Sequence, residues 1–267
     1  IETTSLYPRK GEIIGVGFSV RPHEGAFVDK WIIQKHKDKI NELFKTRIAV
    51  FHNAKFDMQF LRYELGLEFP NFEDTILLHY CLDETVGSHG LKDLAMKFTD
   101  LGDYDKELND YKKEFCRKNK ILLGEFNYGM LPIDILAPYA IKDCDGTFQL
   151  FTKFYPLVVK NEQFFSLFSN ILKPGIKAIM VLENNGGPVD LDYALKVVND
   201  YEIDIEECIH ELQLDPDISR FERLEGKVFN PNSRNQVSKL FFEYKRLKPV
   251  KMTKGGAWTV DKEVLAE

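Results

Sequence analysis

Apolar runs typical of strands open the chain, and helical spacing replaces them further along. The run Glu12–Val20 is rich in β-branched and apolar residues, and residues 25–29 can pair with it as a hairpin. Residues 47–51 form a short, almost entirely apolar run, which predicts a buried strand. Between residues 31 and 44 apolar positions return at helical spacing and predict one helix. The shared side of this helix would contain Ile33, His36, Ile40, Leu43 and Phe44.

Helical patterns then continue to about residue 155. They cover residues 54–65, 74–82, 91–98 and 131–155. Asn53 stands where an N-cap belongs, and Pro132 and Pro138 mark the start of the last helix or a kink in it. Strands first, and then a strand alternating with helices, predict an α/β layered domain.

A charged stretch, residues 99–131, interrupts this pattern as an insertion. Its aromatic and apolar residues recur at helical spacing, so we expect an amphipathic helix with one packed side. These residues are Tyr104, Leu108, Tyr111 and Phe115. The charges of such a helix most often form a solvated face, and contact with a partner is the alternative.

Beyond residue 163 the pattern becomes that of two long helices. The first is predicted to end at a glycine pair, and the second to begin with Asp190 or Asp192 as its cap. A short turn between them predicts an antiparallel helical hairpin. We therefore place one domain at residues 1–158 and a second, helical region at residues 159–267.

Composition agrees with two globular domains. Of the 267 residues, 44% are hydrophobic and 13% aromatic, which supplies packed cores. The four cysteines are dispersed singly, which argues against a zinc or disulfide framework and favours free thiols in a reducing compartment. No apolar run approaches the length of a membrane span, so we expect no membrane partner.

Cations gather near the C-terminus although the net charge of the chain is −6. The net charge argues mildly against a nucleic-acid-binding protein. The C-terminal segment is a local exception, because it contains a single acid, Glu243. Lysines that only keep the surface soluble are one interpretation; contact with phosphates becomes the better one if a nuclease domain precedes them. The cations are Arg234, Lys239, Lys245, Arg246, Lys248, Lys251 and Lys254.

Three acids stand at the edges of three separate predicted elements. Glu2 ends a strand, Asp57 lies in the first turn of a helix, and Asp143 lies in the long helix. Mg²⁺ takes oxygen ligands, and a pair of such ions can activate water for phosphoryl transfer if several elements deliver acids to one spot. Tyr139 precedes Asp143 by four residues, so its phenol shares that helix face and can orient a water. Each acid alone would be an ordinary surface residue.

Two polar residues near Asp57 have simpler interpretations. Asn53 is more readily a helix cap than a substrate ligand, and His52 more readily a local hydrogen-bonding residue than a metal ligand.

Taken in order, "IET", "HNAKFD", "EDT", "GSHGLKDLA" and "YAIKDCDGTFQL" resemble the motifs of the proofreading 3′→5′ exonuclease superfamily. The resemblance implies a ribonuclease H-like fold with a central mixed sheet. "IKAIMVLENNGGPVDLD", "FNPNSRNQVSKLFFE" and "LKPVKMTKGGAWTVDKEVL" resemble the start of the thumb of family A DNA polymerases. Only the insertion lies outside the resemblance, and it favours a phage-type enzyme.

The resemblance also implies an activity and a site. A nuclease of this kind removes 3′-terminal nucleotides of DNA as monophosphates with two Mg²⁺ or Mn²⁺ ions. Glu2 would be a metal ligand of the first motif, Asp143 would bind the first ion, Asp57 would support the second through water, and Tyr139 would orient the attacking water. Leu6 would wedge between the last bases, and Asn53 would contact the terminal nucleotide. The implied substrate-binding residues are Thr3, Leu6, His52, Asn53 and Phe56.

One expected residue precedes the chain as given. In the superfamily an Asp stands two residues before the position of Glu2, and here that position lies before Ile1. The strand that would lead to Glu2 is missing as well, so we expect the chain to be a slice of a longer one. The expected partners are the remaining thumb, palm and fingers, single-stranded 3′ ends and primer–template DNA, in the cytoplasm of a bacterium or of a phage-infected host.

Two alternatives stay open from the sequence. The missing Asp motivates a non-catalytic module that only positions DNA. An RNA-trimming exonuclease would share the acids, although it would not explain the thumb-like segment.

Overall fold

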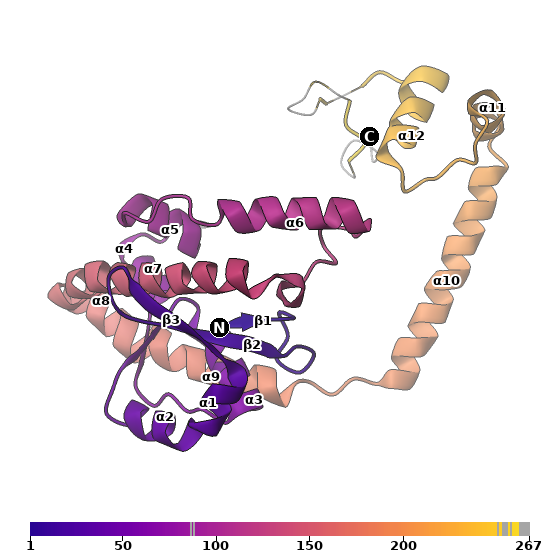
Figure 1. Ribbon diagram of the computed structural model, residues 1–267. Coiled ribbons are helices and arrows are strands. Elements are labelled where there is room, and N and C mark those ends of the chain that lie inside the picture. Colours follow the sequence, from indigo (N-terminus) through magenta and orange to yellow (C-terminus); the bar gives the residue numbers. More distant parts are fainter. Residues whose placement is uncertain (86, 88, 250, 253–255, 257, 262–267) are drawn as a thin grey trace. The chain divides into compact units, whose positions relative to one another are not determined.

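The computed structural model describes residues 1–85, 87, 89–249, 251–252, 256 and 258–261. Contacts divide the chain into two compact units, residues 1–186 and residues 187–267, and each has an apolar cluster of its own. In the first unit three strands come first, two more strands then alternate with helices, and a run of helices follows (Figure 1). Its strands are β1 (Glu2–Thr3), β2 (Ile13–Arg21), β3 (Glu24–Asp29), β4 (Ala49–Phe51) and β5 (Phe72–Asp74). Its helices are α1 (Lys30–Lys35), α2 (Lys37–Phe44), α3 (Ala54–Leu65), α4 (Thr75–Leu82), α5 (Leu91–Phe98), α6 (Lys106–Asn119), α7 (Ile133–Lys160), α8 (Glu162–Leu167) and α9 (Lys173–Asn185).

The three N-terminal strands form one antiparallel sheet in the order β1-β2-β3. Gly15 in the central strand is paired with Glu2 on one side and with Asp29 on the other. The predicted hairpin is confirmed, and so is the short strand end that carries Glu2.

β4 and β5 form a second, parallel ladder, with Ala49 opposite Phe72 and Phe51 opposite Asp74. Parallel strands end at the same edge, so the residues after Phe51 lie beside those after Asp74. The expected mixed sheet is thus represented, among the described residues, by an antiparallel and a parallel ladder.

Helix α7 packs across β2 and β3 and runs beside α5 and α6 (Figure 1). Close approach to β2 depends on Gly17, where a Cβ would lie 2.7 Å from Sγ of Cys144 and 3.1 Å from the carbonyl oxygen of Ala140. Such distances leave no room for a side chain, so the glycine allows the strand to contact the helix directly.

Separate apolar clusters hold α7 and the sheet in place. One joins β2 to α3 and β5 and contains the fully buried Phe60 and Phe72. A second joins α6 to α7 through Leu108 and Leu136. Truncation of a buried Phe of this kind costs about 3–5 kcal/mol, which makes these rings a main source of stability.

The prediction of a single helix at residues 31–44 is wrong, because the structure has two helices there, α1 and α2. His36, with φ −108° and ψ 13°, separates α1 from α2. Because the break changes the helix direction, Ile33 is buried, whereas Leu43 and His36 are exposed.

The amphipathic helix expected in residues 99–131 is confirmed as α6. Leu108 and Cys116 are buried along it, and Tyr111 and Phe115 pack against the same cluster. Tyr104 lies before the helix and is also buried.

The first unit extends past the predicted boundary at residue 158. α8, a π-helical turn (Phe168–Leu172) and α9 form the helix expected there, and Phe168, Ile176 and Met180 are buried. By length and apolar composition alone, this 24-residue segment, Glu162–Asn185, is capable of crossing a membrane. The sequence analysis expected no segment of that length, but one such helix is weak support for a span.

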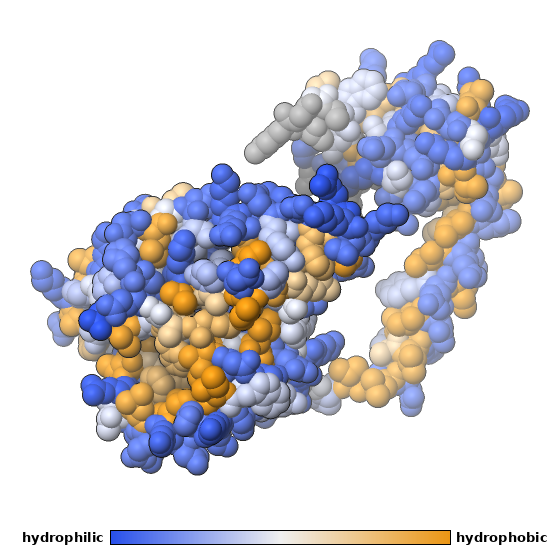
Figure 2. Space-filling model, in the orientation of Figure 1, coloured by the Kyte–Doolittle hydropathy of each residue, from blue (hydrophilic) through white to orange (hydrophobic). Residues whose placement is uncertain are grey.

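The second unit consists of α10 (Leu191–Gln213), α11 (Pro216–Glu225), α12 (Arg234–Lys239) and a π-helical turn (Leu240–Tyr244). Asp190, one of the two predicted caps, accepts a hydrogen bond from Tyr193 N at 2.9 Å and begins α10. Apolar side chains on α10 are exposed, as Figure 2 shows. Because the predicted hairpin pairs α9 of one unit with α10 of the other, it stays a prediction.

Candidate active site

The structure brings the sequence-predicted acids of the first unit into one neighbourhood. The backbone nitrogen of Ile1 donates to Oδ1 of Asp57 at 2.9 Å, which joins the start of β1 to the first turn of α3. Glu2, the next residue, is only 8% exposed and interacts electrostatically with both Asp57 and Asp143. A strand end, a helix start and the middle of α7 carry these three carboxylates.

Asp143 is held by two residues that the sequence reading did not select. The ammonium of Lys92 on α5 donates to Oδ1 of Asp143, and the hydroxyl of Tyr104 donates to the same oxygen at 2.5 Å. Lys92 also donates to the Tyr104 oxygen at 3.0 Å. Lys92 could have been noticed in the sequence. It lies in the first turn of α5, where the helix dipole favours an acid, so a cation there indicates a nearby negative charge.

Two phenols complete the surroundings of Asp143. Tyr139 lies four residues earlier on α7, and its oxygen is 3.5 Å from that of Tyr128. The Lys92 ammonium lies 4.0 Å from the centroid of the Tyr139 ring. Burial first, and then the negative charge of Asp143, raise the pKa of Tyr139 well above its usual range, so its hydroxyl remains a donor.

Burial and neighbouring charges change the acidity of Glu2. Burial raises its pKa to about 8, Asp143 and Asp57 add to the rise by repulsion, and Lys92 opposes it. Burial likewise raises the pKa of the neighbouring Cys144 to about 12. A divalent cation would relieve this repulsion, and carboxylate oxygens are the ligands that Mg²⁺ and Mn²⁺ prefer.

The donor set therefore fits such ions in chemistry. Among the described residues, however, no group of three or more His, Cys, Asp or Glu side chains forms a preassembled metal site. The nitrogen of Ile1 donates to Oδ1 of Asp57, and the ammonium of Lys92 donates to Oδ1 of Asp143, so these two oxygens already have partners.

Asn53 does not cap α3 with its side chain, which corrects the sequence reading. Asp74 takes that role, because the parallel register of β4 and β5 places it beside the helix start: its carboxylate accepts from Asn53 N at 3.3 Å and from Ala54 N at 2.7 Å. Asn53 is exposed, with φ 73°, a left-handed conformation that Asn tolerates.

His52 forms a local hydrogen bond, as expected from the sequence. Its Nδ1 lies 2.8 Å from Oγ1 of Thr75, and that hydroxyl donates to the Phe51 carbonyl at 3.2 Å. Burial lowers the pKa of His52 to about 4.

The remaining predicted substrate residues have different surroundings. Leu6 is 77% exposed in the turn after β1, and the hydroxyl of Thr3 donates to the Ser5 carbonyl at 2.8 Å. Phe56 packs against the core, with its ring 5.1 Å from that of Phe60.

The basic segment of the second unit is more neutralised than its sequence indicates. α11 and its N-cap provide acids that the local count omitted: Lys239 pairs with Glu225 at 2.7 Å, and Lys245 pairs with the N-cap Asp215 at 2.6 Å. Lys251 lies 3.4 Å from Asp261. Arg234, Arg246 and Lys248 are exposed, and Lys254 lies outside the described residues.

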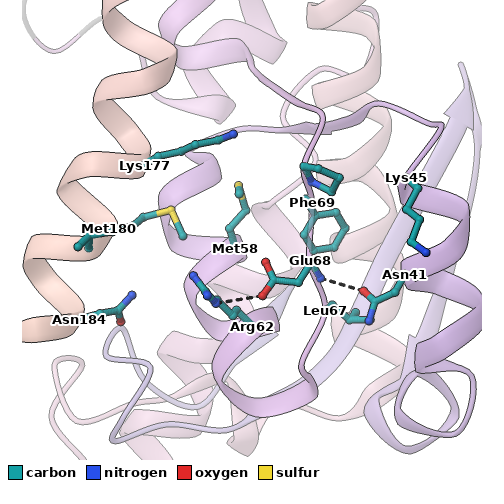
Figure 3. Close-up of a pocket in the computed structure, with 12 residues that line it drawn as sticks. Asn41, Lys45, Met58, Arg62, Leu67, Glu68, Phe69, Lys177, Met180 and Asn184 are labelled. Atoms are coloured by element: carbon teal, nitrogen blue, oxygen red, sulfur yellow. Dashed lines mark hydrogen bonds and ion pairs between the residues drawn. The ribbon is translucent and has the colours of Figure 1, made fainter.

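A well-formed pocket lies apart from the three acids. It measures about 600 Å³ and lies between α2, α3 and α9 (Figure 3). Met58, Phe69 and Met180 form its apolar wall, and none of the three acids lines it.

Comparison with known proteins gives consistent results. The family model described as 3′-5′ exonuclease, of the DNA polymerase A type, matches residues 1–158. A DNA polymerase of Escherichia phage T5 is 38% identical over all of this chain and 32% of its own length. A DNA polymerase of Bacillus phage SP01 is 29% identical, over 95% of this chain and 29% of its own length.

A solved structure, titled as the POL domain of Pol1 from M. smegmatis in complex with DNA primer-template and dNTP, matches with a TM-score of 0.56 and 17% identity. It covers all of this chain, which covers 40% of that chain, and it shows the fold. The fold and the matches together define an exonuclease-type α/β unit joined to a helical unit. The chain belongs to the 3′-5′ exonuclease family of the A-type DNA polymerases, and it spans about a third of the length of the phage relatives.

Proposed function

We propose that this chain is the proofreading part of a family A DNA polymerase and hydrolyses the 3′-terminal phosphodiester of DNA, releasing a nucleoside monophosphate. The observation that carries the proposal is the convergence of Glu2, Asp57 and Asp143, with Tyr139 on the same face of α7 as Asp143. The family match over residues 1–158 supports the same activity.

Two divalent ions, Mg²⁺ or Mn²⁺, would be held by Glu2, Asp57 and Asp143, and when bound they activate water and stabilise the leaving 3′ oxygen. Tyr139 keeps its proton and is placed to donate a hydrogen bond that orients the attacking water. Asn53, with its side chain free of the cap, is available to the terminal nucleotide, and exposed Leu6 is available to wedge between bases. Thr3, His52 and Phe56 would be further substrate-binding residues.

The second unit would contact the DNA backbone through Arg234, Arg246 and Lys248. The phage relatives, named DNA polymerases, favour primer–template DNA and the remaining polymerase domains as partners. The cytoplasm of a bacterium, including a phage-infected one, is the compartment in which we propose that the chain acts.

The test gives 5′-labelled single-stranded DNA, with and without Mg²⁺, to a protein extended upstream of Ile1 by one strand, so that the expected Asp of the first motif is included. We expect a ladder that shortens from the 3′ end, and its loss in Asp143→Ala. Asp134→Ala is the matched control, because Asp134 is an exposed acid in the first turn of the same helix.

Other outcomes would select the alternatives. DNA binding without product, unaffected by EDTA, would establish a module that only positions DNA. Faster shortening of a ribo-oligonucleotide of the same sequence would identify an RNA-trimming enzyme. A Mg²⁺-dependent ladder that persists in Asp143→Ala would overturn the site.

A further inference from the structure

Oδ1 of Asp143 is the acceptor for two donors at once. The Lys92 ammonium and the Tyr104 hydroxyl both donate to it, and Lys92 also donates to the Tyr104 oxygen at 3.0 Å. The three groups form a closed ring of hydrogen bonds. A carboxylate oxygen has two lone pairs, so these two donors saturate Oδ1.

The ammonium is fixed from several directions. It lies 4.2 Å from the centroid of the Tyr104 ring and 4.0 Å from that of Tyr139, so two aromatic rings add cation–π attraction to the hydrogen bonds. Glu2 and Asp105 add attraction at longer range. The Lys92 side chain is nonetheless 30% exposed, which leaves it a route into solvent.

This arrangement conflicts with a metal ion at the same carboxylate. A divalent ion binds a carboxylate oxygen at about 2.0–2.1 Å, and an ion that binds through Oδ1 would take the place of one of the present donors. A dication and an ammonium also repel each other at such a distance. Tyr104 belongs to the inserted segment 99–131, so this segment helps to hold the competing cation.

We propose that Lys92 is the resting-state counter-ion of Asp143, held there by Tyr104, and that a divalent ion binds Asp143 only as the ammonium leaves Oδ1. The proposal rests on the proposed function, because it takes Asp143 as a metal ligand. Lys92 and Tyr104 are positioning residues in this scheme. Together they set the metal concentration at which the site fills.

The first test measures Mn²⁺ binding by electron paramagnetic resonance, without DNA. We expect Lys92→Met to bind Mn²⁺ about tenfold more tightly than the unchanged chain, and Tyr104→Phe to bind it more tightly by a smaller factor. Lys92→Arg keeps the positive charge, so its Kd for Mn²⁺ should equal or exceed that of the unchanged chain. Lys97→Met is the matched control, an exposed lysine on the same helix. Thermal unfolding of each variant checks that it is folded.

A second test distinguishes displacement from repulsion at a distance. Lysines of the unchanged chain are labelled with an acylating reagent at rising Mg²⁺ concentration, and peptide masses report each site. We expect labelling of Lys92 to rise several-fold as Mg²⁺ saturates the site, because the freed amine reaches the reagent, and labelling of Lys97 to stay constant.

The outcomes separate this inference from the proposed function. Equal Mn²⁺ affinity in Lys92→Met and Lys97→Met, or unchanged labelling of Lys92 while metal binds, would overturn the counter-ion and leave the nuclease intact. Mn²⁺ binding that survives Asp143→Ala unchanged would instead overturn Asp143 as a metal ligand, and with it both proposals.

Discussion

Oδ2 of Asp74 accepts a hydrogen bond from the backbone nitrogen of Ala54 at 2.7 Å, while Oδ1 of the same carboxylate accepts from Ile76 N at 2.8 Å. One buried side chain thus begins two helices, α3 and α4. α3 carries Asp57, so the position of a candidate metal ligand depends on a residue from another strand.

Replacement of Asp74 by Ala should therefore be severely destabilising. It leaves donors of Asn53, Ala54 and Ile76 unpaired, and we expect a loss of about 3 kcal/mol in the free energy of unfolding. Urea denaturation measures the loss. Asp190→Ala, which removes the exposed cap of α10, should cost only about 1 kcal/mol; equal losses in the two variants would contradict the prediction.

Stability should fall in acid because of His52. Its pKa is about 4 in the folded chain against 6.5 as the ordinary value, so the folded state resists protonation. The contribution is fully present above pH 6.5 and is lost as the pH falls towards 4, with roughly 2 kcal/mol gone between pH 7 and pH 5.

Urea unfolding at these two pH values checks the difference. His52→Gln should remove that part of the pH dependence, whereas His36→Gln, at an exposed position, should retain it. A His52→Gln variant with the same acid sensitivity as the unchanged chain would refute this assignment.

Tyr139→Phe should slow hydrolysis without unfolding the chain. Loss of a hydroxyl that orients water lowers such rates by about 10²-fold, and the ring itself would keep its packing. Tyr128→Phe is the paired control, since its oxygen lies behind that of Tyr139 at 3.5 Å, and its effect should be much smaller. Single-turnover rates on labelled DNA decide between them; similar losses would mean that the phenol pair acts as a unit.

Removal of metal should stop hydrolysis and leave the fold intact. Asp57 and Asp143 already have partners in the Ile1 nitrogen and the Lys92 ammonium, so EDTA should not lower the melting temperature. Excess Mg²⁺ or Mn²⁺ should restore the rate. A chain that unfolds on chelation would instead have a structural metal.

Cations of the second unit should differ in their contribution to DNA binding. Arg246→Ala and Lys248→Ala, at exposed positions, should each reduce the slope of log affinity against log salt by about one. Lys245→Ala should leave that slope unchanged and destabilise the unit, because Lys245 is paired with Asp215 and Asp217. Salt titrations of fluorescence anisotropy measure both.

Local patterns predicted much of this molecule, because local chemistry determines those features. The hairpin of β2 and β3, α6 and the cap at Asp190 follow from periodicity and cap residues in one stretch of chain. The break at His36 has no such signal in the apolar spacing. The cap of α3 was predicted as Asn53 and is Asp74. The pairing of β4 with β5, which local patterns do not reveal, places the Asp74 carboxylate beside the start of α3.

The candidate site shows the same limit. Glu2, Asp57, Tyr139 and Asp143 could be selected from motifs, yet the partners of Asp143 come from α5 and from the segment before α6. The charge of the basic segment was predicted from that segment alone. Glu225 and Asp215 lie earlier in the chain, and they neutralise Lys239 and Lys245.

Gly17 has a consequence for any attempt to diversify this protein. The contact it allows is with Cys144, the residue directly after Asp143, so a methyl group at position 17 would push on the part of α7 that carries the candidate chemistry. In a randomised library screened for nuclease activity, glycine should be the surviving choice at position 17, whereas the open Gly124, with nothing within 4 Å of a Cβ, should accept many residues.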